Sequence, residues 1–177
     1  MFRISQYMRE LAHAEQTGHY PEVRERKARG PVVIWNLIRR CNLTCKHCYA
    51  LSADHDYVGE LTLPEVFTVM DDLKGFGVPA LILSGGEPLL RPDIFEISAQ
   101  ARKLGFYTGL STNGTLIDRP LAQRIAQEGF DYVGISLDGL KPTHDKFRRL
   151  DGAFDRSLAA VRFLAEFGVK VGLRFTM

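Results

Sequence analysis

Apolar residues along this chain form short runs of strand length that alternate with longer stretches of helical periodicity. This alternation favours β-strands connected by α-helices over a fold built from one element type. The unit of strand, loop and helix recurs roughly every thirty residues, which is typical of a parallel sheet with crossover helices. Five strands are expected, over residues 32–38, 80–83, 106–111, 132–137 and 169–175.

Capping residues and glycines mark the ends of the expected helices. Thr62 and Glu65 form a capping-box pattern at the start of a helix that is expected to end near Gly75 or Gly77. Three further helices are expected, from near Pro92 to Gly105, from Asp118 and Pro120 to Gly129, and from Phe154 to Phe167.

The number of these units limits the fold. A complete eight-stranded barrel runs to about 250 residues, whereas this chain has 177 residues. The fold class is therefore α/β, with the form of a partial barrel, an open sheet or a truncated piece of a larger barrel. Residues 31–177 are expected to form this core.

Residues 1–30 are expected to be a separate N-terminal extension and linker. Apolar residues at positions 4, 7, 8 and 11 recur at helical spacing and predict a short amphipathic helix over residues 1–11. The rest reads as a linker, whose charged run VRERKARG is expected to be a solvated tether. In the alternative hypothesis, a lid over an anionic substrate is formed by Arg24, Arg26, Lys27 and Arg29.

Composition excludes several classes of protein. A hydrophobic fraction of 45% over 177 residues is enough for one well-buried domain. The formal charge of +2 gives no reason to expect a nucleic-acid partner. The sequence has no apolar run long enough to span a bilayer and no signal-peptide pattern. With reduced cysteines, these features predict a cytoplasmic protein without a membrane partner.

All three cysteines lie within eight consecutive positions, as Cys41, Cys45 and Cys48. Disulfide pairing would leave one thiol over, so the group predicts a metal site. Zinc and [4Fe-4S] clusters normally take four protein ligands. Either His47 or His55 completes a zinc site, or one coordination position stays open for another ligand. In a third interpretation, the cysteines are small buried residues on one stripe of a helix.

Polar motifs follow each of the first four expected strands. The cysteine segment follows the first strand, and the others are Gly85-Gly86-Glu87-Pro88, Ser111-Thr112-Asn113-Gly114 and Ser136-Leu137-Asp138-Gly139. Asn-Gly and Asp-Gly often mark hairpins, but helical patterns rather than partner strands follow both. Because ligands bind at the carboxyl ends of parallel strands, the four loops are expected to meet at one binding rim.

The spacing C-x3-C-x2-C resembles the signature of the radical S-adenosylmethionine (radical SAM) enzymes, with His47 at a position often held by an aromatic residue. The resemblance implies an enzyme in which the three thiolates hold three irons of a [4Fe-4S] cluster. S-adenosylmethionine (SAM) would chelate the fourth iron through its amino and carboxylate groups. Its reductive cleavage would give a 5'-deoxyadenosyl radical that abstracts hydrogen from a substrate.

The same resemblance implies roles for the rim residues. The backbone of Gly85 and Gly86, with Glu87, would accept hydrogen bonds from the SAM amino group. The segment His144-Asp145-Lys146-Phe147-Arg148 is similar to the family's H-D-x-x-R segment, so Arg148, or alternatively Arg149, would pair with the SAM carboxylate. The remaining cofactor-binding candidates are His47, Tyr49, Pro88, Ser111, Asn113, Ser136, Asp138 and Leu173.

Longer runs, including FRISQYMRELAH and LILSGGEPLLRPDIFEIS, resemble the radical SAM family of heme d1 biosynthesis, NirJ. That resemblance implies a tetrapyrrole substrate, 12,18-didecarboxysiroheme, modified at its propionate side chains, and an electron donor such as flavodoxin or ferredoxin. Arg39 and Arg40 would anchor substrate carboxylates or balance the cluster charge. Related heme-synthesis decarboxylases and peptide-modifying maturases share the core motifs. Family members continue into a sixth strand and further cysteines, so the chain is expected to be an N-terminal portion.

Overall fold

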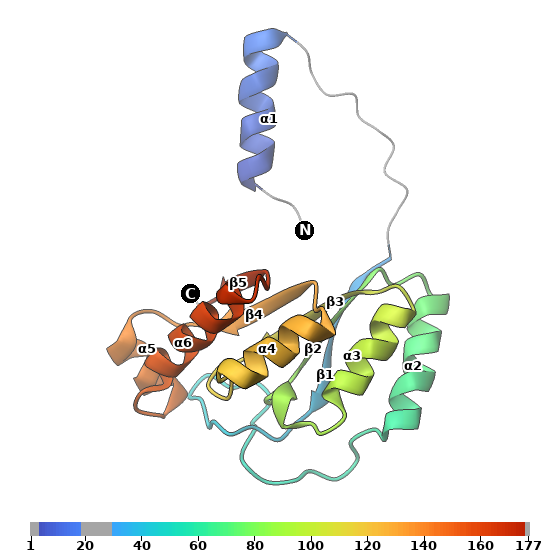
Figure 1. The fold of residues 1–177 in the computed structure, drawn as a ribbon, viewed down its shortest axis with the longest axis vertical. Coiled ribbons are helices and arrows are strands. Elements are labelled where there is room, and N and C mark those ends of the chain that lie inside the picture. Colours follow the sequence, from blue (N-terminus) through green and yellow to red (C-terminus); the bar gives the residue numbers. More distant parts are fainter. Residues whose placement is uncertain (1–3, 19–29, 176–177) are drawn as a thin grey trace.

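The computed structural model describes residues 4–18 and 30–175. Its centre is a sheet of five parallel strands that lie side by side in chain order (Figure 1). The strands are β1 (Val32–Ile38), β2 (Ala80–Gly85), β3 (Tyr107–Thr112), β4 (Tyr132–Ser136) and β5 (Val171–Arg174).

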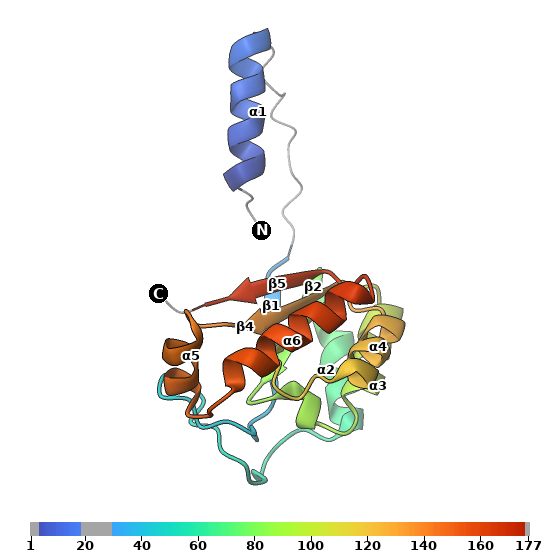
Figure 2. The ribbon, with the colours of Figure 1, turned by 60° about the vertical axis from the view of Figure 1, so that its left-hand side comes forward.

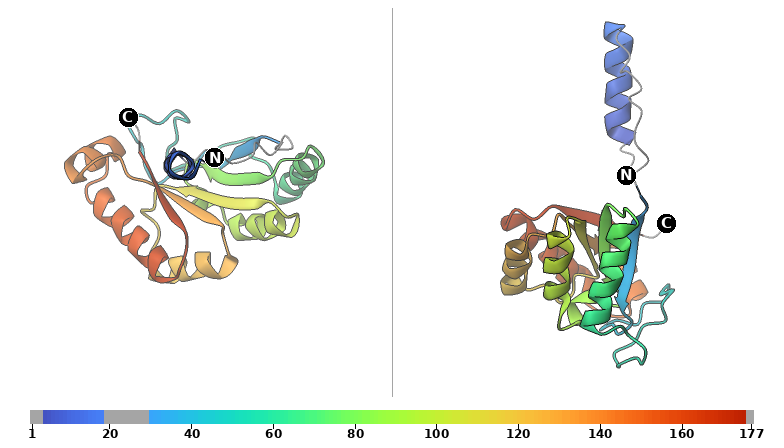
Figure 3. Two further views of the ribbon diagram at one scale, coloured as in Figure 1. Left: turned by 90° about the horizontal axis from the view of Figure 1, so that it is seen from above. Right: turned by 90° about the vertical axis from the view of Figure 1, so that its right-hand side faces the viewer.

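Helices connect the strands and cover one side of the sheet. They are α2 (Leu63–Gly75), the short 3-10 helix η1 (Pro88–Leu90), α3 (Ile94–Lys103), α4 (Arg119–Glu128), α5 (Lys141–Arg148) and α6 (Ala153–Glu166). Seen from above, the strands form an arc with the helices on its outer side (Figure 3). This arrangement confirms the predicted α/β fold and its form as a partial barrel.

The two faces of the sheet differ in composition because successive strand residues point to opposite sides. Residues that face the helices are large and apolar, and Leu81, Leu83, Leu110, Val133 and Ile135 are fully buried there. The inner face is mixed: Ile34, Ile82 and Tyr132 lie on it, whereas small or polar residues follow toward the carboxyl ends of the strands, including Ser84, Ser111, Gly134 and Ser136. The helix-facing side therefore forms the core, and the polar positions of the inner face gather at the carboxyl ends of the strands.

The predicted helix signals are present. The Glu65 carboxylate accepts hydrogen bonds from the Thr62 backbone N–H at 2.8 Å and from its hydroxyl at 2.7 Å, which completes the capping box. Asp118 caps α4, where its carboxylate accepts from the Leu121 N–H at 2.9 Å. Gly129 ends α4 with a φ of 70°, a left-handed conformation that glycine adopts without strain.

Two elements of the structure were not predicted. The helix α5 has few apolar residues, so its sequence KPTHDKFR lacks the periodic stripe that marks a helix. The turn η1 is too short for a period to be visible. Strand boundaries differ slightly, and the fifth strand is shorter than expected, at Val171–Arg174.

The predicted N-terminal helix is present as α1 (Ile4–Thr17), and it is longer than expected. Figures 1 and 2 draw it apart from the sheet and the helices that cover it. Residues 19–29, which include most of the predicted linker and the hypothetical lid, lie outside the described residues. None of the helices in the described ranges has the length and apolar character needed to cross a membrane.

Candidate functional site

A cavity of about 480 Å³ lies at the carboxyl ends of the strands. This volume is within the range of pockets that bind small molecules or cofactors. Residues from the loops after β1, β2, β3 and β4 all contribute to its wall. The predicted site residues in this wall are Cys41, Cys45, His47, Cys48, Tyr49, Gly85, Gly86, Ser111, Asn113, Ser136, Asp138 and Arg148.

Three of the predicted residues, Glu87, Pro88 and Leu173, do not line the cavity. Glu87 is fully buried behind the wall, and Pro88 is buried at the start of η1. Leu173 is 55% exposed and lies on the opposite face of β5 from Arg174, which does line the cavity.

Several lining residues were missed by the motif-based prediction. Half of them are apolar, namely Ile34, Leu43, Ala50 and Phe175, and half are polar, namely Ser52, Ser84, Thr112 and Arg174. The two-residue period of the strands could have found Ser84 and Arg174, because both belong to the inner-face set of positions. Arg174 adds a second guanidinium to the wall that already contains Arg148.

Each thiol has N–H donors directed at its sulfur. Cys41 Sγ accepts from the Leu43 backbone N–H at 3.4 Å and from the Asn113 amide at 3.8 Å. Cys45 Sγ accepts from the Arg148 guanidinium at 3.6 Å. Hydrogen bonds of this kind stabilise the thiolate form and tune the potential of an iron-sulfur cluster. The donor set therefore fits a thiolate-bound cluster.

The thiols differ in acidity. Burial raises the pKa of Cys41 to about 11. Burial also acts to raise the pKa of Cys48, but backbone N–H groups of residues 50–52 outweigh it and lower the pKa overall. Because a thiol must lose its proton to bind metal, metal loading should require more free energy at Cys41 than at Cys48.

The histidines proposed as zinc ligands have other partners. His47 Nε2 lies 3.4 Å from the Asp138 carboxylate, and His55 stacks on Tyr57 with a centroid distance of 4.2 Å. Within residues 4–18 and 30–175, no three His, Cys, Asp or Glu side chains form a group that could hold one metal ion.

Gly85 and Gly86 permit close contact between two loops. A Cβ atom at Gly85 would lie 2.2 Å from the Ile38 carbonyl oxygen, and one at Gly86 would lie 2.3 Å from that of Arg40. The Gly86 N–H donates to Ile38 O at 2.6 Å. These glycines therefore fix the backbone just before Cys41, a role that the sequence analysis did not foresee.

Glu87 connects the loops that follow β2 and β3. Its carboxylate accepts hydrogen bonds from the Thr112 hydroxyl at 2.8 Å, the Asn113 N–H at 2.9 Å and the Leu89 N–H at 3.2 Å. Burial raises the pKa of Glu87 to about 7, although these hydrogen bonds oppose the shift. In this position Glu87 holds the wall of the cavity together from behind.

The segment containing His144 and Arg148 forms α5 and packs behind the loop that follows β4. The Asp138 N–H donates to His144 Nδ1 at 3.0 Å, and the Asp138 carboxylate forms a buried ion pair with Arg148. Asp145 accepts from Gly152 N–H at 2.9 Å, just before α6. Arg149 is exposed and does not line the cavity.

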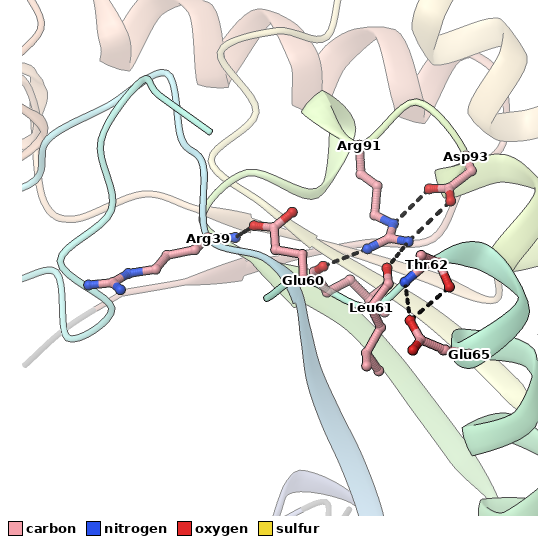
Figure 4. A network of polar contacts seen from close by, with 8 residues as sticks. Arg39, Glu60, Leu61, Thr62, Glu65, Arg91 and Asp93 are labelled. Carbon is pink, nitrogen blue, oxygen red and sulfur yellow. Dashed lines mark hydrogen bonds and ion pairs between the residues drawn. The ribbon is translucent and has the colours of Figure 1, made fainter. Parts of the chain in front are cut away.

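Arg91 joins the two ends of the long loop that carries the thiols (Figure 4). Its buried guanidinium donates to the Leu37 carbonyl at the end of β1, at 2.8 Å, and to the Leu61 carbonyl before α2, at 2.9 Å. It also pairs with Asp93 at 2.7 Å. These contacts fix where the loop begins and ends relative to the sheet.

Arg39 and Arg40 contact other residues of the same loop and do not line the cavity. The Arg39 guanidinium lies over the Tyr57 ring at 4.4 Å from its centroid. Arg40 pairs with Asp54 at 2.8 Å and with Asp56 at 3.1 Å. Their side chains therefore already have partners within the loop.

Comparison with known proteins gives a consistent result. The family model of the Radical SAM superfamily matches residues 35–177. The chain is 52% identical over 180 residues to pre-heme d1 synthase of Dinoroseobacter shibae, covering all of this chain and 43% of that protein. It is 50% identical over 151 residues to Fe-coproporphyrin III synthase of Methanosarcina barkeri, covering 85% of this chain and 38% of that protein. The chain thus spans about two fifths of the length of these relatives.

Solved structures share the fold. Native anSMEcpe with bound AdoMet (S-adenosylmethionine) superposes with a TM-score of 0.65 at 27% identity, covering 79% of this chain and 42% of that one. Streptococcus suis SuiB bound to S-adenosylmethionine superposes with a TM-score of 0.70 at 18% identity, covering 96% of this chain and 37% of that one. At that identity, the likeness to SuiB concerns the fold alone.

Proposed function

This chain belongs to the radical SAM superfamily, and from this premise we propose that Cys41, Cys45 and Cys48 hold a [4Fe-4S] cluster beside a SAM molecule in the cavity. The observation that carries the proposal is that all three thiols face one cavity together with the loops that follow β2, β3 and β4. When bound, the reduced cluster supplies the electron that cleaves SAM to methionine and a 5'-deoxyadenosyl radical.

The chain's own residues bind and orient the cofactor. Ser111, Asn113 and Ser136 offer short polar groups suited to the ribose hydroxyls and the methionyl group of SAM. Arg148 has a lining position next to Cys45 and is held there by Asp138, so it is our candidate for the SAM carboxylate. Residues 31–177 form the radical SAM core in this proposal, and residues 1–30 form an extension.

Glu87 and the adjacent glycines act as positioning residues. Glu87 contacts the loop after β3 from behind, and Gly86 contacts the backbone before Cys41. Together they set the distance between the thiol loop and the polar groups proposed to bind SAM. Catalysis of this kind depends on such placement, because the cofactor performs the bond cleavage.

For the substrate, we propose a tetrapyrrole with carboxylate side chains, acted on at the propionates of 12,18-didecarboxysiroheme. Support comes from the 52% identity to pre-heme d1 synthase over the whole chain. The 50% identity to Fe-coproporphyrin III synthase favours a second candidate, a decarboxylation of a related iron porphyrin. A reducing protein such as flavodoxin or ferredoxin would supply the electron.

The cluster proposal is tested by electron paramagnetic resonance of anaerobically reconstituted, reduced protein with and without SAM. We expect a [4Fe-4S]⁺ signal that changes shape when SAM is added. A signal whose shape does not change when SAM is added, or a protein that binds zinc but not iron, would overturn the proposal.

The substrate proposal is tested separately by absorption titration of the reconstituted protein. We expect 12,18-didecarboxysiroheme to shift its Soret band on binding, and Fe-coproporphyrin III to bind more weakly. Tighter binding of Fe-coproporphyrin III would favour the second candidate. If neither tetrapyrrole binds but the paramagnetic resonance signal still responds to SAM, the tetrapyrrole proposal is rejected. The cluster proposal is then unaffected.

A further inference from the structure

Arg174 is a cavity-lining cation that no motif of the sequence analysis included. It is the last residue of β5 and lies beside Ser136 of β4 in the strand register. Its guanidinium donates a hydrogen bond to the Ser111 hydroxyl on β3. The side chain therefore extends from β5 across β4 to β3, along the inner face of the sheet.

The inner face has room for this path because Gly134 has no side chain. A Cβ atom at Gly134 would lie 2.7 Å from Arg174 Nε and 3.2 Å from Arg174 Cζ. Gly134 pairs with Ser111 on one side and with Gly172 on the other. The Tyr132 side chain occupies the space over Gly172, where a Cβ atom would lie 2.3 Å from its hydroxyl oxygen, and Gly134 leaves room for both Tyr132 and the Arg174 guanidinium.

The two arginines of the cavity differ in their charge partners. Arg148 is paired with the buried carboxylate of Asp138. Arg174 has the neutral Ser111 hydroxyl as a partner, and no acidic side chain in the described ranges forms an ion pair with it. Among the described residues its guanidinium therefore has no acidic partner within ion-pair distance, in a cavity whose wall is partly apolar.

We propose that Arg174 binds a carboxylate group of a ligand in this cavity. A guanidinium presents a planar fork of donors that matches a carboxylate in a bidentate contact. Ser111 orients the fork from one side and leaves its other N–H groups for the ligand. The inference rests on the proposed function, because both SAM and a tetrapyrrole with propionate side chains carry carboxylates. Arg174 is thus a binding residue in addition to Arg148.

The carboxylate could belong to SAM or to a tetrapyrrole. Each is therefore compared with a matched ligand that lacks free carboxylates. The reconstituted full chain and its Arg174→Gln variant are titrated with SAM and with decarboxylated SAM. They are also titrated with Fe-coproporphyrin III and with its tetramethyl ester. Arg174→Gln should weaken binding of one free-acid ligand by about tenfold to a hundredfold and leave the matching ligand without free carboxylates almost unaffected. The ligand pair that responds identifies the source.

Two further variants control the experiment. Arg156→Gln removes the same charge from an exposed position on α6 that does not line the cavity, and it should bind all ligands as the wild type does. Gly134→Ala keeps the charge of Arg174 but places a methyl group 2.7 Å from Nε, so it should displace the guanidinium and reproduce part of the loss. It also provides a second test if Arg174→Gln fails to fold.

The outcomes distinguish this inference from the proposed function. Wild-type protein that shows no SAM-dependent signal and binds no ligand would overturn both. Wild-type binding that Arg174→Gln leaves within twofold for every ligand would overturn the inference alone. Loss of iron in Arg174→Gln with unchanged ligand affinity would also overturn it, since Arg174 would then balance the cluster charge.

Discussion

The two faces of the same sheet show how stability and function are divided in this molecule. On the helix side, large apolar residues such as Leu110 and Ile135 are fully buried. On the inner side, the alternating neighbours Ser111 and Ser136 line a cavity. Each strand therefore serves both purposes through its two-residue period. The difference predicts that adjacent substitutions on one strand affect separate properties.

The largest effect is expected at the thiols on the rim of the inner face. Cys45→Ala removes one cluster ligand and should abolish SAM cleavage, a fall of about a thousandfold or more, while the unfolding of metal-free protein changes little. Iron content and 5'-deoxyadenosine formation measure the first effect, and urea unfolding of the metal-free protein measures the second. Cleavage activity that survives in Cys45→Ala would contradict the cluster assignment.

The next largest effect is expected from a comparison of two neighbouring residues on β3, Leu110 and Ser111. Leu110→Ala opens a cavity in the fully buried core and should lower the free energy of unfolding by about 3 kcal/mol. Ser111→Ala removes a hydroxyl on the inner face and should lower it by about 1 kcal/mol or less. Urea unfolding of the metal-free proteins tests the difference. Equal losses in the two variants would contradict the division between the faces.

A smaller effect is expected at Gly86, where the loop after β2 contacts the backbone of the segment before Cys41. A Cβ atom at Gly86 would lie 2.3 Å from the Arg40 carbonyl oxygen, so Gly86→Ala must displace the segment before Cys41. We expect a loss of about 2 kcal/mol in unfolding free energy and a lower iron content after reconstitution.

Gly75→Ala is the matched control for this substitution. A Cβ atom at Gly75 would meet no atom within 4 Å. The control should therefore reconstitute with iron as the wild type does. A Gly86→Ala variant that loads iron equally well would show that this backbone contact does not position the thiol loop.

The outer face was predictable from the sequence because burial imposes a simple pattern. The apolar runs placed all five strands, and the bounds of β1 at Val32–Ile38 match the prediction. The capping residues Thr62 and Asp118 marked helix starts correctly. In these cases local chemistry and tertiary packing favour the same element, so the sequence alone was sufficient.

The inner face was harder to predict because its residues are selected for space and charge rather than for burial. Arg174 was missed because it belongs to no motif, and its role depends on Gly134, a residue on another strand. Glu87 was expected to face the ligand, but it lies behind the wall. Such roles depend on contacts between segments far apart in the chain, which a motif does not contain.

The last prediction concerns the Glu87 carboxyl, which lies behind the inner face and affects stability only through pH. The folded-state pKa of Glu87 is about 7, above its ordinary value of 4.5, so folding favours the protonated form. Its contribution to stability is therefore present below pH 4.5 and is lost as the pH rises to 7. At about 1.4 kcal/mol per pKa unit, wild type should lose roughly 2 kcal/mol between pH 5 and pH 8 relative to Glu87→Gln.

Glu65→Gln provides the control of opposite sign for this measurement. Its carboxylate accepts hydrogen bonds from Thr62, which lower the pKa of Glu65, so its contribution is present above its ordinary pKa and is lost as the pH falls further. Between pH 5 and pH 8, Glu65→Gln should therefore keep the wild-type slope, whereas Glu87→Gln should flatten it. Urea unfolding at both pH values measures the slopes. Parallel slopes for wild type and Glu87→Gln would mean that the Glu87 carboxyl titrates normally, and that its burial behind the cavity wall carries no cost to the ionised form.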